Sequence, residues 1–217
     1  MLKENLLEIY AKSFHDNWSL PALTDYISKE TITYEDFARR IARIHLFYEQ
    51  CGIQKGDKIA LMGKNTTTWV TVFMATVTYG AVIVPVLQDF NPQDAQHIIN
   101  HSDAVMLFVT PGIWESFEYE KLPNIKSVIS LDTRLVLAEK EGNEGATEKI
   151  IQNLSNEFAK RYPNGFGRKD IKYPTIPNNS LAVINYTSGT TGFSKGVMLT
   201  LNNLCGNVVY GINSRLH

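Results

Sequence analysis

The sequence has few cysteines and no excess of charge of either sign, and these absences narrow the class of protein. Cys51 and Cys205 lie far apart, and neither belongs to a CxxC pair or another metal-ligand spacing. We therefore expect two free thiols in a reducing, cytoplasmic setting. The net charge is −1 and no basic stripe is present, which argues against nucleic acid as a partner. The first ten residues mix charged and apolar side chains, as an amphipathic helix does and a signal peptide does not.

The sequence also lacks a long uninterrupted apolar segment. Residues 65–88 carry no charge, but six threonines, Gly80 and Pro85 interrupt them, whereas a membrane span needs about 20 mostly apolar residues. We expect instead a helix that Asn65 caps and Gly80 ends, followed by a buried strand over residues 81–86. No transmembrane segment is expected. A peripheral membrane contact stays open, and the sequence does not define an oligomeric state.

Helical and extended patterns alternate along the chain. Thr33 and Asp36 form a capping-box pattern, and Pro92 after Asn91 is typical of a first helical turn. The charged stretch over residues 138–149 is expected to be a solvated loop or the lead-in to a helix, without a binding role. The order predicts an α/β fold with a mostly parallel sheet flanked by helices, whose strand ends, and any ligand, share one edge. Helices are expected at 3–14, 34–51, 66–79, 92–103, 111–120 and 147–161, and strands at 21–27, 30–34, 81–86, 104–109, 126–131 and 181–188. Residues 54–63 are expected to form a turn and a buried strand.

Neither a GxSxG motif nor a complete GxGxxG motif occurs, but residues 186–200 read YTSGTTGFSKGVMLT. Glycines let the backbone approach a ligand, and successive N–H groups in such turns can cradle an anion. Hydroxyl groups add neutral donors, and the lysine adds a compact positive charge that suits phosphate. This combination predicts a polyphosphate site. The predicted binding residues are Thr187, Ser188, Gly189, Thr190, Thr191, Gly192 and Lys195.

The loop differs from a Walker A loop. That motif places glycine directly before the lysine and Ser or Thr directly after it, whereas Ser194 precedes Lys195 here and Gly196 follows. The residues after the lysine are extended in pattern, so the loop is expected to join two strands, with Thr200 or Asn202 capping a later helix. A glycine-rich surface turn without a ligand is the alternative that these residue types leave open.

Other candidate sites are weaker. His97 and His101 have the i, i+4 spacing of a metal pair, but no third ligand is evident, so we predict no metal site. Two further groups are interpreted as structural. Trp69, Phe73 and Tyr79 are expected to pack in the core, and Arg39, Arg40 and Arg43 are expected on a solvated helix face.

The stretch from Tyr186 to Val197 resembles the phosphate-binding signature of the adenylate-forming superfamily, which includes acyl-CoA synthetases, adenylation domains of peptide synthetases and luciferases. Residues 32–86 and 91–104 are similar to that family's N-terminal region. Two departures stand out, because the family usually has proline where Ser194 lies and often has histidine where Leu201 lies. Neither removes a phosphate donor of the pattern.

The resemblance implies that residues 1–217 are the N-terminal portion of the large domain of a longer enzyme, and most similar to long-chain fatty acyl-CoA synthetases. Such enzymes join a carboxylic acid to ATP, which yields an acyl-adenylate, and then to coenzyme A. ATP, Mg²⁺ and coenzyme A are the implied ligands, and ATP phosphates would lie at the predicted loop. The resemblance places no catalytic or metal-ligating residue within these 217 residues, and it implies that they are inactive alone.

Two other function classes stay open. A hydrolase of another phosphate-binding family would need an apolar run ending in aspartate, and residues 127–132 match that pattern as well as they match the adenylating fold. A non-catalytic interaction module would fold well without affinity for ATP or pyrophosphate.

Overall fold

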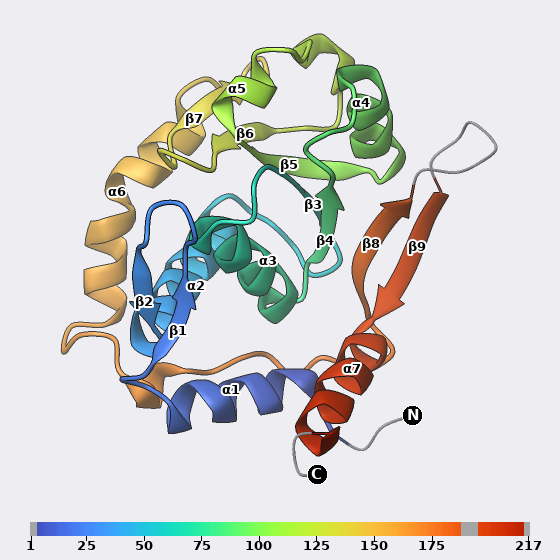
Figure 1. The fold of residues 1–217 in the computed structure, drawn as a ribbon. Coiled ribbons are helices and arrows are strands. Elements are labelled where there is room, and N and C mark those ends of the chain that lie inside the picture. Colours follow the sequence, from blue (N-terminus) through green and yellow to red (C-terminus); the bar gives the residue numbers. More distant parts are fainter. Residues whose placement is uncertain (1–3, 188–194, 215–217) are drawn as a thin grey trace.

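The computed structural model describes residues 4–187 and 195–214. Within these ranges, seven strands form one sheet in the order β7-β6-β5-β3-β4-β8-β9, and β1 and β2 form a separate antiparallel pair (Figure 1). The inner strands are parallel, and only the edge strands β7 and β9 run antiparallel to their neighbours. The expected mostly parallel α/β sheet is confirmed. The strands are β1 (Pro21–Thr24), β2 (Thr31–Thr33), β3 (Lys58–Met62), β4 (Val82–Val86), β5 (Ala104–Val109), β6 (Ser127–Ser130), β7 (Val136–Glu139), β8 (Leu181–Thr187) and β9 (Lys195–Thr200).

Helices cover both faces of the sheet because neighbouring residues of the buried strands point to opposite sides. In β3, Ile59 and Leu61 pack in one apolar cluster with α1, α2, α3 and α7, while Ala60 and Met62 pack in another with α4. The helices are α1 (Leu6–Asp16), α2 (Tyr34–Gln50), α3 (Thr67–Tyr79), α4 (Pro92–His101), α5 (Pro111–Trp114), α6 (Ala146–Arg161) and α7 (Leu201–Ser214).

The capping and stop residues that the sequence predicts for α2 and α3 are found in the structure, with one correction. Thr33 and Asp36 form the expected capping box at the start of α2, and Gly80 ends α3 in the left-handed conformation with a φ of 92°. The residue that caps α3, however, is Thr66, whose hydroxyl accepts the N–H of Trp69, and Asn65 lies one residue outside the helix. Both residue types cap helices well, so the pattern alone could not choose between neighbours.

One expectation between β5 and α6 is wrong, and another is wrong in part. The helix predicted over residues 111–120 is limited to α5 and a separate 3-10 turn at Tyr119–Lys121. The Trp114 ring contacts those of Phe117 and Tyr119, so the chain bends to pack these rings instead of continuing the helix. The charged stretch over residues 138–149 leads into α6, as one of the two expected forms would. Its first two residues, however, belong to β7, whose four residues are all partly buried against β6.

Candidate phosphate-binding hairpin

Strands β8 and β9 form an antiparallel hairpin at one end of the sheet (Figure 1). Thr187 pairs with Lys195, and both side chains are exposed. The expectation that the glycine-threonine loop joins two strands is confirmed by these flanks. Of the predicted phosphate-binding residues, the structure places Thr187 and Lys195. The other five, Ser188, Gly189, Thr190, Thr191 and Gly192, lie outside the described residues.

The hairpin opens at the edge where the parallel strands end. Strand β8 runs parallel to β4, with Ile83 level with Val183, so Thr187 and the carboxyl end of β4 lie at the same edge. The adjacent strands β3 and β4 lead into α3 and α4, which pack on opposite faces of the sheet. In parallel sheets, a crevice forms outside the strand ends at such a divergence, and ligands bind there. The hairpin therefore opens at the edge of the sheet where this rule expects a ligand.

Tyr186 anchors the stem of the hairpin. Its ring is 4% exposed, its hydroxyl lies 2.7 Å from Nδ1 of His101 in the last turn of α4, and the two rings meet edge to face at 5.8 Å. Opposite it, a Cβ added to Gly196 would lie 3.1 Å from Cζ of Tyr186. The absence of a side chain at Gly196 thus lets β9 lie directly against the anchored ring.

The sequence pattern gave no sign of the pairing between Tyr186 and His101, because the two residues are 85 positions apart. Histidine is the last residue of α4 and tyrosine is the first of the motif. The rings of His97 and His101 lie 5.8 Å apart and are tilted by 37°. Within the ranges that the structure describes, no group of three potential metal ligands occurs.

The helix after the hairpin begins as predicted. The Thr200 hydroxyl accepts the N–H of Asn203 at 3.4 Å, and the Asn203 side chain accepts the N–H of Thr200 at 2.9 Å. Thr200 therefore caps α7, and the alternative cap, Asn202, lies inside the helix. This reciprocal pair determines where β9 ends, and hence how far the hairpin extends from the sheet.

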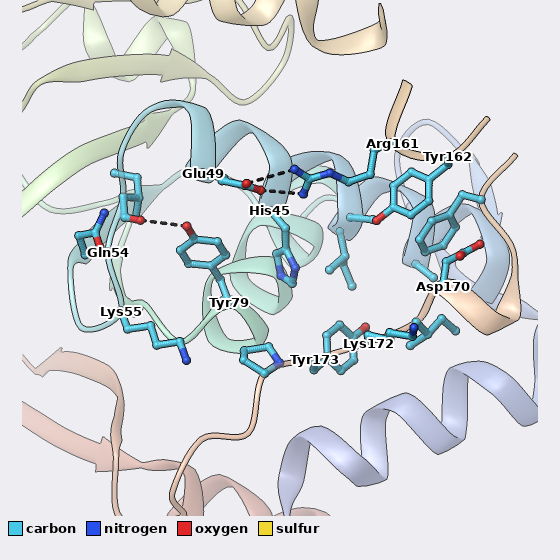
Figure 2. Close-up of a pocket in the computed structure, with 17 residues that line it drawn as sticks. His45, Glu49, Gln54, Lys55, Tyr79, Arg161, Tyr162, Asp170, Lys172 and Tyr173 are labelled. Atoms are coloured by element: carbon cyan, nitrogen blue, oxygen red, sulfur yellow. Dashed lines mark hydrogen bonds and ion pairs between the residues drawn. The ribbon is translucent and has the colours of Figure 1, made fainter. Parts of the chain in front are cut away.

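A separate hollow of about 720 Å³ lies between α2, the end of α3 and the segment after α6 (Figure 2). Glu49 and Arg161 form a two-pronged ion pair across it, at 2.7 and 3.1 Å. Burial lowers the pKa of His45 to about 4, and its Nε2 lies 3.0 Å from the Ala75 carbonyl oxygen. The imidazole is therefore neutral near pH 7 and already bonded. Lys55 and Lys172 also line this hollow.

The remaining sequence candidates are structural. Trp69 and Phe73 stack at 5.6 Å and pack against the core, as expected. Arg39 pairs with Glu35 and Asp36 on its own helix, and Arg40 pairs with Glu30. Arg43 departs from the expected solvated face: it donates to Ser155 of α6 at 2.9 Å and lies over the Phe158 ring.

Both cysteines are free, as expected. Burial raises the pKa of the Cys51 thiol to about 12 and also raises that of Cys205, so both thiols stay protonated near pH 7 and are poor nucleophiles. None of the helices in the described ranges combines the length and the apolar character that crossing a membrane requires.

The sequence matches the AMP-binding enzyme family over residues 11–216. The chain belongs to that family. It is 31% identical over 170 residues to long-chain-fatty-acid–CoA ligase 5 of Rattus norvegicus, covering 73% of this chain and 24% of that protein. It is 27% identical over 189 residues to luciferin 4-monooxygenase of Photuris pensylvanica, covering 84% of this chain and 32% of that protein.

The fold has a counterpart among solved structures. A long-chain-fatty-acid–CoA ligase from Archaeoglobus fulgidus superposes with a TM-score of 0.72 at 21% identity, over 96% of this chain and 38% of that one. This AMP-binding chain therefore spans about a quarter to two fifths of the length of these three proteins. The resemblance inferred from residues 186–197 is confirmed at the level of the family.

Proposed function

We propose that the β8–β9 hairpin holds the β and γ phosphates of ATP in an enzyme that activates a carboxylic acid. The observation that carries the proposal is the pairing of Thr187 with Lys195, which places a hydroxyl and an ammonium group at the two ends of a loop rich in glycine and threonine. The N–H and hydroxyl groups of Ser188, Gly189, Thr190, Thr191 and Gly192 complete the proposed cradle. Membership of the AMP-binding family supports this assignment.

In the proposed reaction, the carboxylate oxygen of the acid attacks the α-phosphorus of ATP. The bond to the β-phosphate bridging oxygen breaks, and pyrophosphate leaves with the electron pair. Negative charge grows on the leaving group, so a fixed cation and N–H donors that face it lower the barrier. Lys195 supplies that cation. Mg²⁺ bound with ATP would neutralise further charge, and the described residues contribute no cluster of ligands to it.

The substrate class and the second step extend the proposal. We assign a fatty acid as substrate and coenzyme A as the acceptor that displaces AMP, because the rat relative is named a long-chain-fatty-acid–CoA ligase. The luciferin 4-monooxygenase relative keeps other carboxylic acids open. We further propose that residues 1–217 form the N-terminal portion of the adenylation domain and work in the cytoplasm.

Two variants test the phosphate site. In a longer chain that carries this sequence and shows ATP–pyrophosphate exchange, Lys195→Ala should slow exchange about 10²-fold, the scale for losing one electrostatic donor in a transition state. Lys149→Ala is the matched control, because Lys149 is exposed on α6, far from the hairpin (Figure 1). An unchanged exchange rate in Lys195→Ala would remove this residue from the mechanism.

The alternatives predict different results in the same assays. A phosphate-binding hydrolase would release inorganic phosphate from ATP without a carboxylic acid present. A non-catalytic interaction module would bind neither ATP nor pyrophosphate, although the chain stays folded. Pyrophosphate exchange that depends on added acid separates all three functions.

A further inference from the structure

A cavity of about 360 Å³ lies on the half of the sheet that is remote from the β8–β9 hairpin. It is lined by residues of α2, α3, α6, strands β5 and β6, and the turn after β6. Phe47, Phe108 and Leu154 are among its apolar residues, and Phe47 and Phe108 are almost fully buried. Hydroxyl groups also line it, from Thr68, Thr71, Ser130 and Thr133. This volume lies within the range of about 300–1,000 Å³ that small-molecule sites in proteins occupy.

Three arginines line this apolar cavity. Arg40 and Arg43 come from α2, and Arg134 comes from the turn between β6 and β7. Among the described residues that line it, none is an aspartate or a glutamate. Arg40 is neutralised by Glu30 at 2.7 Å, and Arg43 donates one bond to the neutral Ser155. Within the part of the chain that the structure describes, Arg134 forms no ion pair.

The turn fixes Arg134 in place. Its backbone is left-handed, with a φ of 62°, which is uncommon for a residue other than glycine. Ser130 is fully buried. Its hydroxyl accepts the N–H of Thr133 at 3.0 Å, and its carbonyl accepts the N–H of Arg134 at 2.9 Å. These hydrogen bonds fix the backbone of Arg134, whose exposed side chain lines the cavity.

The two unneutralised guanidinium groups also act on each other. Burial lowers the pKa of Arg43, and the charge of Arg134 lowers it further. Like charges at the mouth of an apolar cavity repel, and an anion placed between them would turn this repulsion into attraction. Guanidinium groups bind carboxylate and phosphate oxygens through paired N–H bonds.

We propose that this cavity binds a single-tailed amphiphile with an anionic head, a carboxylate or a phosphate. Arg43 and Arg134 hold the head at the mouth, and the alkyl tail lies against Phe47, Phe108 and Leu154. The site is separate from the hairpin, since β5 and β6 lie on the opposite side of β3 and β4 from β8 and β9. The amphiphile bound here is therefore not the acid that reacts at the hairpin, and the proposal does not depend on the proposed function.

Four probes test the ligand chemistry by calorimetric titration, applied to the 217-residue chain with Lys195→Ala, which removes the cation of the proposed phosphate hairpin. We expect saturable binding of decanoate and decyl phosphate, at least tenfold weaker binding of decanol, and no binding of inorganic phosphate. A stronger response to decanoate points to free acids as the source, and a stronger response to decyl phosphate points to phosphorylated lipids. Equal binding of decanol would overturn the proposal, as would binding of inorganic phosphate alone or no saturable binding of either anion.

Three variants test the location. Arg134→Asn keeps a residue type that tolerates the left-handed turn and should weaken binding of the preferred anion about tenfold, the effect of losing a charged hydrogen bond. Arg168→Asn is the matched control, because Arg168 is exposed and does not line the cavity. Leu154→Trp should abolish binding by filling the tail space. Circular dichroism verifies folding.

The proposed location would be wrong if Arg168→Asn weakened binding as much as Arg134→Asn does. It would also be wrong if Arg134→Asn left the affinity unchanged. Lys195→Ala should bind the anions as the unchanged chain does. Pyrophosphate exchange tests the hairpin proposal, and the titrations test the cavity proposal. Either proposal can therefore be rejected while the other stands.

Discussion

At the scale of single residues, Gly196 is a position in the hairpin stem where a side chain would be crowded. An added Cβ would lie 3.1 Å from both Ile184 Cγ2 and Tyr186 Cζ, and the tyrosine ring cannot yield freely because His101 holds its hydroxyl. We expect Gly196→Ala to lower the free energy of unfolding by about 1–3 kcal/mol, as overpacking does.

Gly211 in α7 provides the comparison, since a Cβ there meets nothing within 4 Å. Gly211→Ala should be neutral or stabilise the protein by up to about 1 kcal/mol, because alanine favours the helix. Urea unfolding of both variants measures the difference. Equal stability of the two variants would show that the stem is not packed as described.

His45 makes the stability depend on pH in a defined window. Its folded pKa of about 4 lies below its ordinary value of 6.5, so the unfolded chain binds a proton first as the pH falls. Stability is then highest above pH 6.5 and declines towards pH 4, by up to about 3 kcal/mol. Tyr79 and Tyr173, whose rings pack against His45, stay neutral here because burial raises the pKa of both.

His45→Gln tests this dependence. Urea midpoints of both proteins, measured from pH 7 to pH 4.5, should converge as the pH falls, because only the unchanged chain loses the contribution of a neutral imidazole. Parallel pH profiles would mean that other groups cause the loss.

At the scale of helices and strands, only one of two neighbouring residues caps the start of α3. Thr66 accepts the N–H of Trp69 at 3.2 Å, and Asn65 is exposed before the helix. Thr66→Ala should therefore destabilise the protein by about 1 kcal/mol, and Asn65→Ala by only a few tenths. Chemical unfolding of the two variants decides between them, and the reverse order would restore Asn65 as the cap.

Elements with local signals could be predicted from the sequence, and elements set by tertiary packing could not. The capping box at Thr33 and the Gly80 stop involve residues within a few positions of one another. Strand β7 instead exists because β6 lies beside it, and α5 ends where aromatic rings turn towards the core. The same division holds for the sites. Thr187 and Lys195 lie in one contiguous motif, whereas Arg43 and Arg134 are brought to one cavity only by the fold.

At the scale of the whole molecule, strand β9 forms an edge with large apolar side chains in solvent. Met198 is 70% exposed and Val197 is 46% exposed. An edge strand with unpaired backbone groups and exposed apolar residues favours association with another chain. We expect the 217-residue chain to associate in a concentration-dependent manner. Sedimentation velocity over a dilution series measures this association, and Met198→Lys, which places a charge on the edge, should reduce it. A monomer at all concentrations would contradict the expectation.

The relatives are about three times as long as this chain, so these 217 residues alone should lack most of what holds substrates together. Binding energy from remote contacts positions reactants for the chemical step, and a lone phosphate cradle supplies little of it. We therefore predict ATP affinity in the millimolar range, about −4 kcal/mol, and no acyl-CoA synthesis. The chain is incubated with ATP, Mg²⁺, coenzyme A and a panel of fatty acids, and AMP is followed, with an active long-chain-fatty-acid–CoA ligase as positive control. Repeated turnover that Lys195→Ala abolishes would show that the hairpin and its sheet suffice for the reaction. Contacts made by the additional residues of the longer relatives would then contribute little to catalysis.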